Sequence, residues 1–167
     1  ITQFMVQLGK ISENDKTHKV AVVTDNVTSL REIDKMDYIR KVTPSENLHS
    51  AYCEAYQSLF EEGYHFIISL HLNPNLKNTY QAAQTARNTV LEGRADDYEI
   101  NVYNTNANGV GLGLIVYELV QAIEYGFSPL EVSQVAKQLS DNYKHWVCPL
   151  EFDFVKNHQW VMNLADN

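Results

Sequence analysis

The stretch KVAVVTD, residues 19–25, sets four consecutive apolar residues between polar ends. A short run this rich in valine is typical of a strand that is covered on both faces, as the strands of a parallel sheet are. Residues 65–70 (HFIISL) and 99–103 (EINVY) have the same character. A weaker fourth run, residues 145–150 (HWVCPL), contains Pro149 and is therefore confined to a sheet edge or a strand end.

Helices with clear start and stop signals are predicted between these strands. Their apolar residues recur at helical spacing over residues 48–60, 78–91, 111–125 and 129–139. Ser45 is placed to cap the first helix and Gly63 to close it, while Ser128 and Glu131 form a capping box before the last. Residues 29–41 are polar and ambiguous. The order of elements predicts an α/β fold, a mostly parallel sheet of about four or more strands flanked by helices.

Length and charge exclude several classes of protein. A chain of 167 residues fits one domain, and its net charge of −8 disfavours nucleic acid and anionic membrane surfaces as partners. No apolar run approaches the roughly 20 residues that span a bilayer, and residues 1–10 lack the pattern of a signal peptide. Cys53 and Cys148 lie far apart in apolar patterns. We expect reduced thiols and a cytoplasmic protein.

Polar side chains follow each of the first three predicted strands, at residues 24–29, 71–79 and 104–109. Ligands of open parallel sheets bind beyond the carboxyl ends of the strands, where loops and helix N-termini converge. The hydroxyls, amides and backbone N–H groups of these segments are suited to an anionic head group. The alternative is that they only cap helices and make turns.

The sequence offers little that indicates catalysis, a metal or a cofactor. The glycines of residues 109–113 (GVGLG) do not have nucleotide-binding spacing, and close packing of a helix on a strand explains them better. The six histidines form no metal-ligand pattern. Among the histidines, His71 alone lies at the carboxyl end of a strand. Two interpretations of His71 remain open, a residue that contacts a ligand and a solvated loop residue. Cys53 has no recognisable basic partner, and we expect no enzymatic activity.

Three segments resemble the DegV family in the same order as in that family. Residues 20–30 (VAVVTDNVTSL) are similar to its first strand and "TDS" loop. Residues 60–86 are similar to its "LSGTYQSA" region at Leu76, Thr79, Tyr80, Gln81 and Ala83. Residues 102–132 are similar to its glycine-containing loop and the two helices that follow. The resemblance spans residues 19 to 159.

The resemblance implies the N-terminal domain of a two-domain bacterial fatty-acid-binding protein. By the same resemblance, some members of that family present the bound fatty acid to a partner kinase that phosphorylates its carboxylate. By this comparison residues 1–18 are an extension or short helix, residues 19–160 the DegV-like domain and residues 161–167 a tail, with the second domain absent. The exposed edge that remains would favour a homodimer or packing on another domain.

Some head-group residues of the family are replaced here. Lys77 stands in place of a serine and Asn78 in place of a glycine, while Thr43 remains near a family threonine. Asn26 and Asn104 replace a serine and an aspartate. We expect a head-group rim centred on Asp25, Lys77 and Thr105. The full set of expected ligand-binding residues is Thr24, Asp25, Asn26, Thr43, His71, Lys77, Asn78, Thr79, Asn104 and Thr105.

Three functions remain open at this stage. The first is non-enzymatic binding of a fatty acid or a related anionic lipid. The second is a degenerate DegV-like domain that has lost lipid binding and serves as an interaction, regulatory or dimerisation module. The replacements at Lys77, Asn78 and Gln159 and the absent second domain favour it. The third, by analogy of fold alone, is phosphoryl transfer through His71.

Overall fold

The computed structural model describes residues 19–26, 36–43 and 47–144. These residues form a four-stranded sheet with strand order β2-β1-β3-β4, and every adjacent pair is parallel. The α/β fold with a parallel sheet is confirmed. The elements in chain order are β1 (Val20–Asp25), β2 (Ile39–Val42), α2 (Leu48–Glu61), β3 (Phe66–His71), α3 (Thr79–Leu91), β4 (Glu99–Asn104), α4 (Gly109–Glu124) and α5 (Pro129–Asn142).

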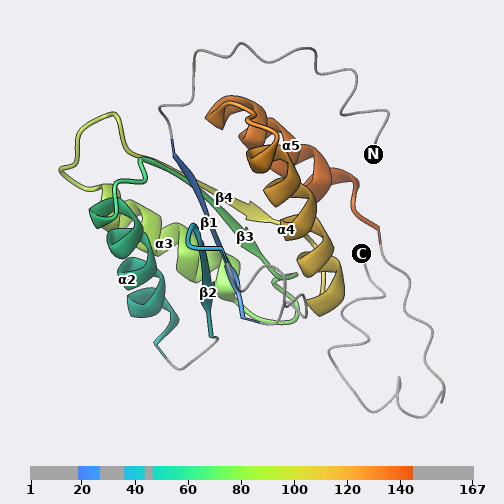
Figure 1. The fold of residues 1–167 in the computed structure, drawn as a ribbon. Coiled ribbons are helices and arrows are strands. Elements are labelled where there is room, and N and C mark those ends of the chain that lie inside the picture. Colours follow the sequence, from blue (N-terminus) through green and yellow to red (C-terminus); the bar gives the residue numbers. More distant parts are fainter. Residues whose placement is uncertain (1–18, 27–35, 44–46, 145–167) are drawn as a thin grey trace.

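Helices cover both faces of the sheet, α2 and α3 on one side and α4 and α5 on the other (Figure 1). Strand alternation divides the core between them. Ala21 and Val23 of β1 pack with α2 and α3, whereas Val20 and Val22 pack with α4 and α5. All six residues of β1 are buried, as expected of a strand that is covered on both faces.

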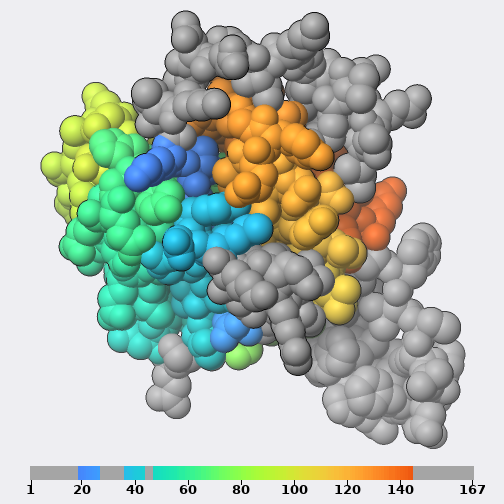
Figure 2. Space-filling view, in the orientation of Figure 1, coloured from blue at the N-terminus to red at the C-terminus, as the bar shows by residue number. Residues whose placement is uncertain are grey.

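The strand β2 was not predicted. The first three of its four residues, IRKV, lie within the stretch 29–41 that looked ambiguous, and only its end residues are buried. It pairs with β1 alone, so it is the edge strand, and Figure 2 shows the segment 36–43 (cyan) at the surface between α2 and α4. A strand this short, with charged residues in its middle, carries too weak an alternation to be recognised.

The predicted helices are present, with small shifts at their ends. The capping box of Ser128 and Glu131 is formed as expected. Asn47 is the N-cap of α2, where its side chain accepts a hydrogen bond from the Ser50 amide, and Ser45 lies outside the described residues. The helix α4 begins two residues earlier than predicted, at Gly109.

The glycines at the start of α4 were attributed to packing against a strand, but the close neighbour of Gly111 is a tyrosine. A Cβ atom built on Gly111 would lie 1.9 Å from the hydroxyl oxygen of Tyr143, the residue that follows α5. Gly111 therefore leaves room for the Tyr143 side chain against the start of α4. Its role is packing, as expected, with a different partner.

Several expectations fall outside the described residues. They concern the N-terminal extension (residues 1–18), the weak strand at residues 145–150, Cys148 and the tail at residues 161–167. Within the part of the chain that is described, no helix combines the length and the apolar composition needed to cross a bilayer.

Candidate functional site

The parallel register brings the carboxyl ends of the strands to one edge of the sheet. Thr24 of β1 lies opposite Leu70 of β3, and His71 of β3 lies opposite Asn104 of β4. The chain then enters the loops before α3 and α4. The two loops are tied together, because the Asn73 amide donates a hydrogen bond of 2.9 Å to the Ala107 carbonyl.

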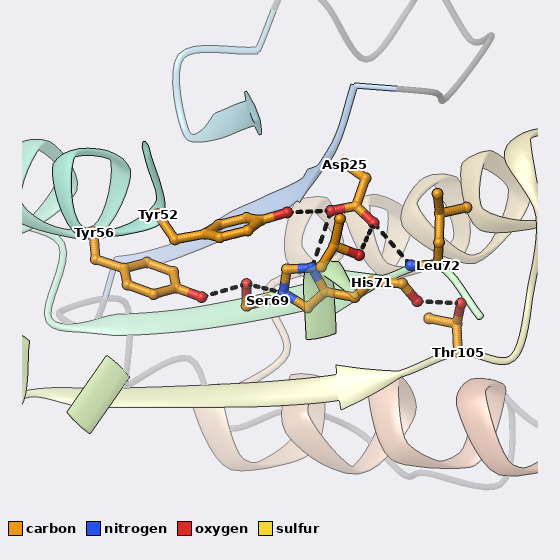
Figure 3. A network of polar contacts seen from close by, with 8 residues as sticks. Asp25, Tyr52, Tyr56, Ser69, His71, Leu72 and Thr105 are labelled. Atoms are coloured by element: carbon orange, nitrogen blue, oxygen red, sulfur yellow. Dashed lines mark hydrogen bonds and ion pairs between the residues drawn. The ribbon is translucent and has the colours of Figure 1, made fainter. Parts of the chain in front are cut away.

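Asp25 ends β1, and its carboxylate is completely buried. Among the described residues four donors converge on it, from α2, β3, α3 and the loop that follows β3. Its Oδ1 atom accepts from the Tyr52 hydroxyl of α2 at 2.5 Å and lies 3.0 Å from Nδ1 of His71. Its Oδ2 atom accepts from the Leu72 amide at 2.9 Å and from the Thr79 hydroxyl at 2.8 Å. Figure 3 shows these contacts meeting at one carboxylate.

The donors decide the charge state of this carboxylate. Burial alone would raise the pKa of Asp25, but the hydrogen bonds from His71, the Leu72 amide and the Tyr52 hydroxyl outweigh burial and lower that pKa. The opposite holds for Tyr52, whose pKa is raised by burial and by the neighbouring Asp25 charge. Asp25 is therefore an ionised acceptor and Tyr52 a neutral donor.

A second chain of contacts runs from the other nitrogen of His71. Nε2 lies 2.8 Å from the Ser69 hydroxyl oxygen, which lies 2.8 Å from the Tyr56 hydroxyl of α2. The His71 ring also meets the Tyr52 ring edge-on, with 5.0 Å between centroids. His71 has no exposed surface, so the expectation of a solvated loop histidine is wrong. In this conformation a phosphodonor has no access to the imidazole.

Sequence reasoning missed Tyr52, Tyr56 and Ser69. The two tyrosines were counted as part of the apolar stripe of α2, and Ser69 as part of an apolar strand. A signal was present, because Ser69 and His71 alternate with Ile68 and Leu70 and so share one face of β3. Two tyrosines four residues apart on a neighbouring helix could then supply hydroxyls to that face.

The third member of the expected rim, Thr105, is also buried. Its hydroxyl donates to the His71 carbonyl at 2.8 Å and accepts from the Ala107 amide at 3.2 Å. Asn104 accepts from the Asn106 amide at 2.9 Å, in a turn where Asn106 has a φ of 51°. Asp25 and Thr105 thus hold the loops in place. We expected them to form a head-group rim with Lys77, but both side chains are buried.

The other expected residues lie at the same edge but are not all brought together. Lys77 and Asn78 are exposed at the start of α3, and Asn78 makes no side-chain cap hydrogen bond there. Asn26 donates from Nδ2 to the Thr43 hydroxyl at 2.9 Å, so these two exposed residues join the ends of β1 and β2. Thr24 is buried, and among the described residues its hydroxyl has no hydrogen-bond partner.

Cys53 has a basic neighbour, contrary to expectation. The Nε2 atom of His49 lies 3.7 Å from its sulfur, one helical turn away on α2. Burial and the charge of Glu54 nevertheless raise the pKa of the thiol, which disfavours a reactive thiolate. Within the described parts of the chain, no group of three or more His, Cys, Asp or Glu side chains is arranged to hold a metal ion.

One apolar surface begins at this edge of the sheet. Val110, Leu114 and Tyr117 follow one another along one side of α4 and are 62%, 50% and 40% exposed. We call these three residues the α4 stripe. Large apolar side chains that gather on one helix face are unusual on a free surface, and they are typical of a binding surface.

Solved structures share this fold. A stearic-acid-binding protein from Eubacterium ventriosum superposes with a TM-score of 0.61 at 16% identity, covering 71% of this chain and 52% of that one. A fatty-acid-binding DegV family protein from Thermus thermophilus gives 0.59 at 20% identity, with 74% and 54% covered. The Streptococcus pneumoniae fatty acid kinase B3 protein, loaded with linoleic acid, gives 0.59 at 18% identity, with 74% and 54% covered.

Sequence comparison identifies the family. A DegV domain-containing protein of Clostridium perfringens is 31% identical over 115 residues, which are 69% of this chain and 38% of that protein. One from Staphylococcus aureus is 28% identical over 122 residues, 73% and 41% of the two chains. The chain thus spans less than half the length of these curated relatives. The model of a family described as uncharacterised proteins of the DegV family matches residues 19–157, so the chain belongs to the DegV family.

Proposed function

We propose that this domain binds a fatty acid or a related anionic lipid without transforming it. The observation that carries the proposal is the charge distribution at the carboxyl edge of the sheet. The described loop segments 72–78 and 104–108 contain no acidic residue, and their one charged side chain is the exposed Lys77. In a chain with a net charge of −8, these two loops are suited to an anion.

The start of α3 adds to this preference. Its first turn contains no acidic residue, and Asn78 does not use its side chain to cap it. The N-terminal amides of a helix attract anions. The Asp25 charge lies close by, but four donors surround it and no part of it is exposed. A carboxylate is therefore expected to contact Lys77 and the amides at the start of α3.

The α4 stripe is proposed to contact the acyl tail. It starts at the N-terminus of α4, which lies at the same edge of the sheet as Lys77. Burying each methylene group stabilises a complex by about 0.8 kcal/mol, whereas an exposed ion pair contributes about 0.2–1 kcal/mol. The tail should thus dominate affinity, and the head group should determine orientation. The relatives named for stearic and linoleic acid support this class of ligand.

A test separates the head group from the tail. Dodecanoate and its uncharged methyl ester are titrated by calorimetry into delipidated wild-type protein and into Lys77→Gln, with Lys137→Gln on α5 as the control. Lys77→Gln should weaken dodecanoate a few-fold, because it removes an ion pair of about 0.2–1 kcal/mol, and should leave the ester unchanged. Equal losses for both ligands, or no dodecanoate binding by wild type, would contradict the proposal.

The α4 stripe also supports a second candidate function, a module that binds another protein surface or a second copy of this chain. The replacements at Lys77 and Asn78 favour it, since neither is the residue that the family resemblance implies. Light scattering of delipidated protein with and without dodecanoate distinguishes the two. A dimer that persists with lipid and is disrupted by Leu114→Ser favours the module. A monomer that binds lipid favours the carrier, for which a lipid kinase is the proposed partner.

A further inference from the structure

The buried polar contacts form a ring that begins and ends on α2. Tyr52 contacts Asp25, Asp25 contacts His71, His71 contacts Ser69, and Ser69 contacts Tyr56. The two tyrosines are one helical turn apart, with 6.3 Å between ring centroids. None of the five side chains is exposed. Figure 3 shows the ring lying between α2 and β3.

The chemistry of the groups fixes the direction of each hydrogen bond. An ionised carboxylate only accepts, so Nδ1 of His71 must carry a hydrogen to contact Asp25. In a neutral imidazole Nε2 is then an acceptor, which requires the Ser69 hydroxyl to donate to it. The Ser69 oxygen in turn accepts from the Tyr56 hydroxyl. Every hydrogen in the ring then has an acceptor.

A second hydrogen on His71 would break this arrangement. Nε2 would donate to Ser69, and only one of the Ser69 and Tyr56 hydroxyls could then donate to the other. Neither hydroxyl has another hydrogen-bond partner among the described residues, so one of the two hydrogens would be buried without an acceptor. The ring therefore selects the neutral form of His71 with its hydrogen on Nδ1.

This form of His71 orients the Asp25 carboxylate. Oδ1 is held by Tyr52 and His71, which leaves Oδ2 directed at the Leu72 amide and the Thr79 hydroxyl. Leu72 and Thr79 are the two ends of the loop that contains Lys77. One carboxylate thus joins the two ends of that loop, and among the described residues Tyr52 and His71 are the two side chains that contact its Oδ1 atom.

We propose that His71, in its neutral form with a hydrogen on Nδ1, is a positioning residue that holds the loop 72–79 in its ligand-binding conformation through Asp25. The order Asp25–His71–Ser69 also resembles a catalytic triad. Ser69 is inaccessible and shared with Tyr56, so the arrangement orients a loop and does not attack a substrate. The link to ligand binding rests on the proposed function; the link to the loop does not.

Two substitutions separate the nitrogens of His71. The amide nitrogen of His71→Asn lies where Nδ1 lies and can still donate to Asp25. The amide of His71→Gln reaches the position of Nε2 and contacts Ser69 instead. Hydrogen exchange of the Leu72 amide, whose acceptor is Asp25, reports the loop directly. The Ile68 amide, within β3, is the internal control.

We expect Leu72 exchange to accelerate at least tenfold in His71→Gln and to stay within about twofold of wild type in His71→Asn, with Ile68 unchanged in both. Nitrogen-15 spectra of wild type should show a protonated Nδ1 and an unprotonated Nε2. Three results would overturn the assignment: equal acceleration of Leu72 exchange in the two variants, unchanged Leu72 exchange in His71→Gln, or a His71 imidazole protonated on Nε2.

Dodecanoate titration of the same variants tests the link to binding. Affinity should fall about tenfold in His71→Gln and remain near wild type in His71→Asn. Unchanged affinity in His71→Gln, alongside faster Leu72 exchange, would overturn the role of this loop in binding. If wild type binds no dodecanoate, the proposed function fails, and Leu72 exchange alone decides whether His71 positions the loop.

Discussion

The two faces of the sheet are held by different kinds of contact, although the same strands form both faces. On the α2 and α3 side, β1 and β3 present Asp25, Ser69 and His71 to the hydroxyls of Tyr52 and Tyr56. On the α4 and α5 side, the buried residues are almost entirely aliphatic. One face thus depends on directional contacts between fixed partners, and the other on contacts that are not directional.

Directional polar contacts thus lie on one side of β1, and apolar packing lies on the other side. A buried polar group costs free energy unless it is partnered, so the hydroxyl-rich face must form in a single arrangement. An aliphatic face tolerates small shifts, because burial of apolar area does not depend on direction. The arrangement of the loop 72–79 is set from the hydroxyl-rich face, through Asp25, and the α4 stripe is on the outside of the aliphatic side.

The largest effect is expected from Asp25→Asn, which breaks the hydroxyl-rich face. The substitution keeps the shape but turns one acceptor into a donor. Because all four partners of Asp25 are donors, at least one pair of donors would then face each other. We expect the free energy of unfolding to fall by about 2–4 kcal/mol, measured by urea denaturation at pH 7. Asp96→Asn, at an exposed position, is the control and should change it little.

The same variant has a defined pH signature. The pKa of Asp25 is lower in the folded state than in the unfolded chain, where it is near 4. The ionised carboxylate therefore contributes its full stabilisation at pH values above about 4. That contribution is lost as the pH falls through the lower folded value. The difference between wild type and Asp25→Asn should be constant from pH 5 to 7 and should shrink below about pH 4. A difference that persists unchanged at pH 2.5 would contradict this assignment.

A smaller effect is expected from Tyr56→Phe, which opens the ring at its far end. Ser69 would keep its contact with His71 and lose one donor. We expect a loss of about 1–2 kcal/mol in the free energy of unfolding, because the site is fully buried. Tyr80→Phe removes a half-buried hydroxyl that accepts from Gln84 on the same helix, and it should cost less than about 0.5 kcal/mol. Equal losses would mean that the ring contributes no more than a surface pair.

The sequence predicts the layered fold better than it predicts the site. The run VAVVTD and the capping box at Ser128 are local patterns, and the structure forms the strand and the helix start that they predict. The ring depends on Tyr52 and Tyr56 meeting β3 across a packed interface. The alternation of Ser69 and His71 in β3 indicates a polar face, but it does not indicate which helix supplies the partners of that face. Asp25 was found because it ends a strand. Its burial could not be seen, because the four donors come from segments up to 54 residues away.

The smallest effect is expected from Thr24→Val, which tests the aliphatic face. By strand alternation Thr24 points toward α4 and α5, and its hydroxyl is buried without a partner among the described residues. Removing an unpartnered hydroxyl at constant shape should raise the free energy of unfolding by up to about 1 kcal/mol. Thr79→Val is the matched control, an equally buried threonine whose hydroxyl donates to Asp25, and it should lower it by about 1–2 kcal/mol. If both substitutions destabilise equally, Thr24 is as firmly bonded as Thr79, and the two faces of the sheet do not differ in the way their polar groups are held.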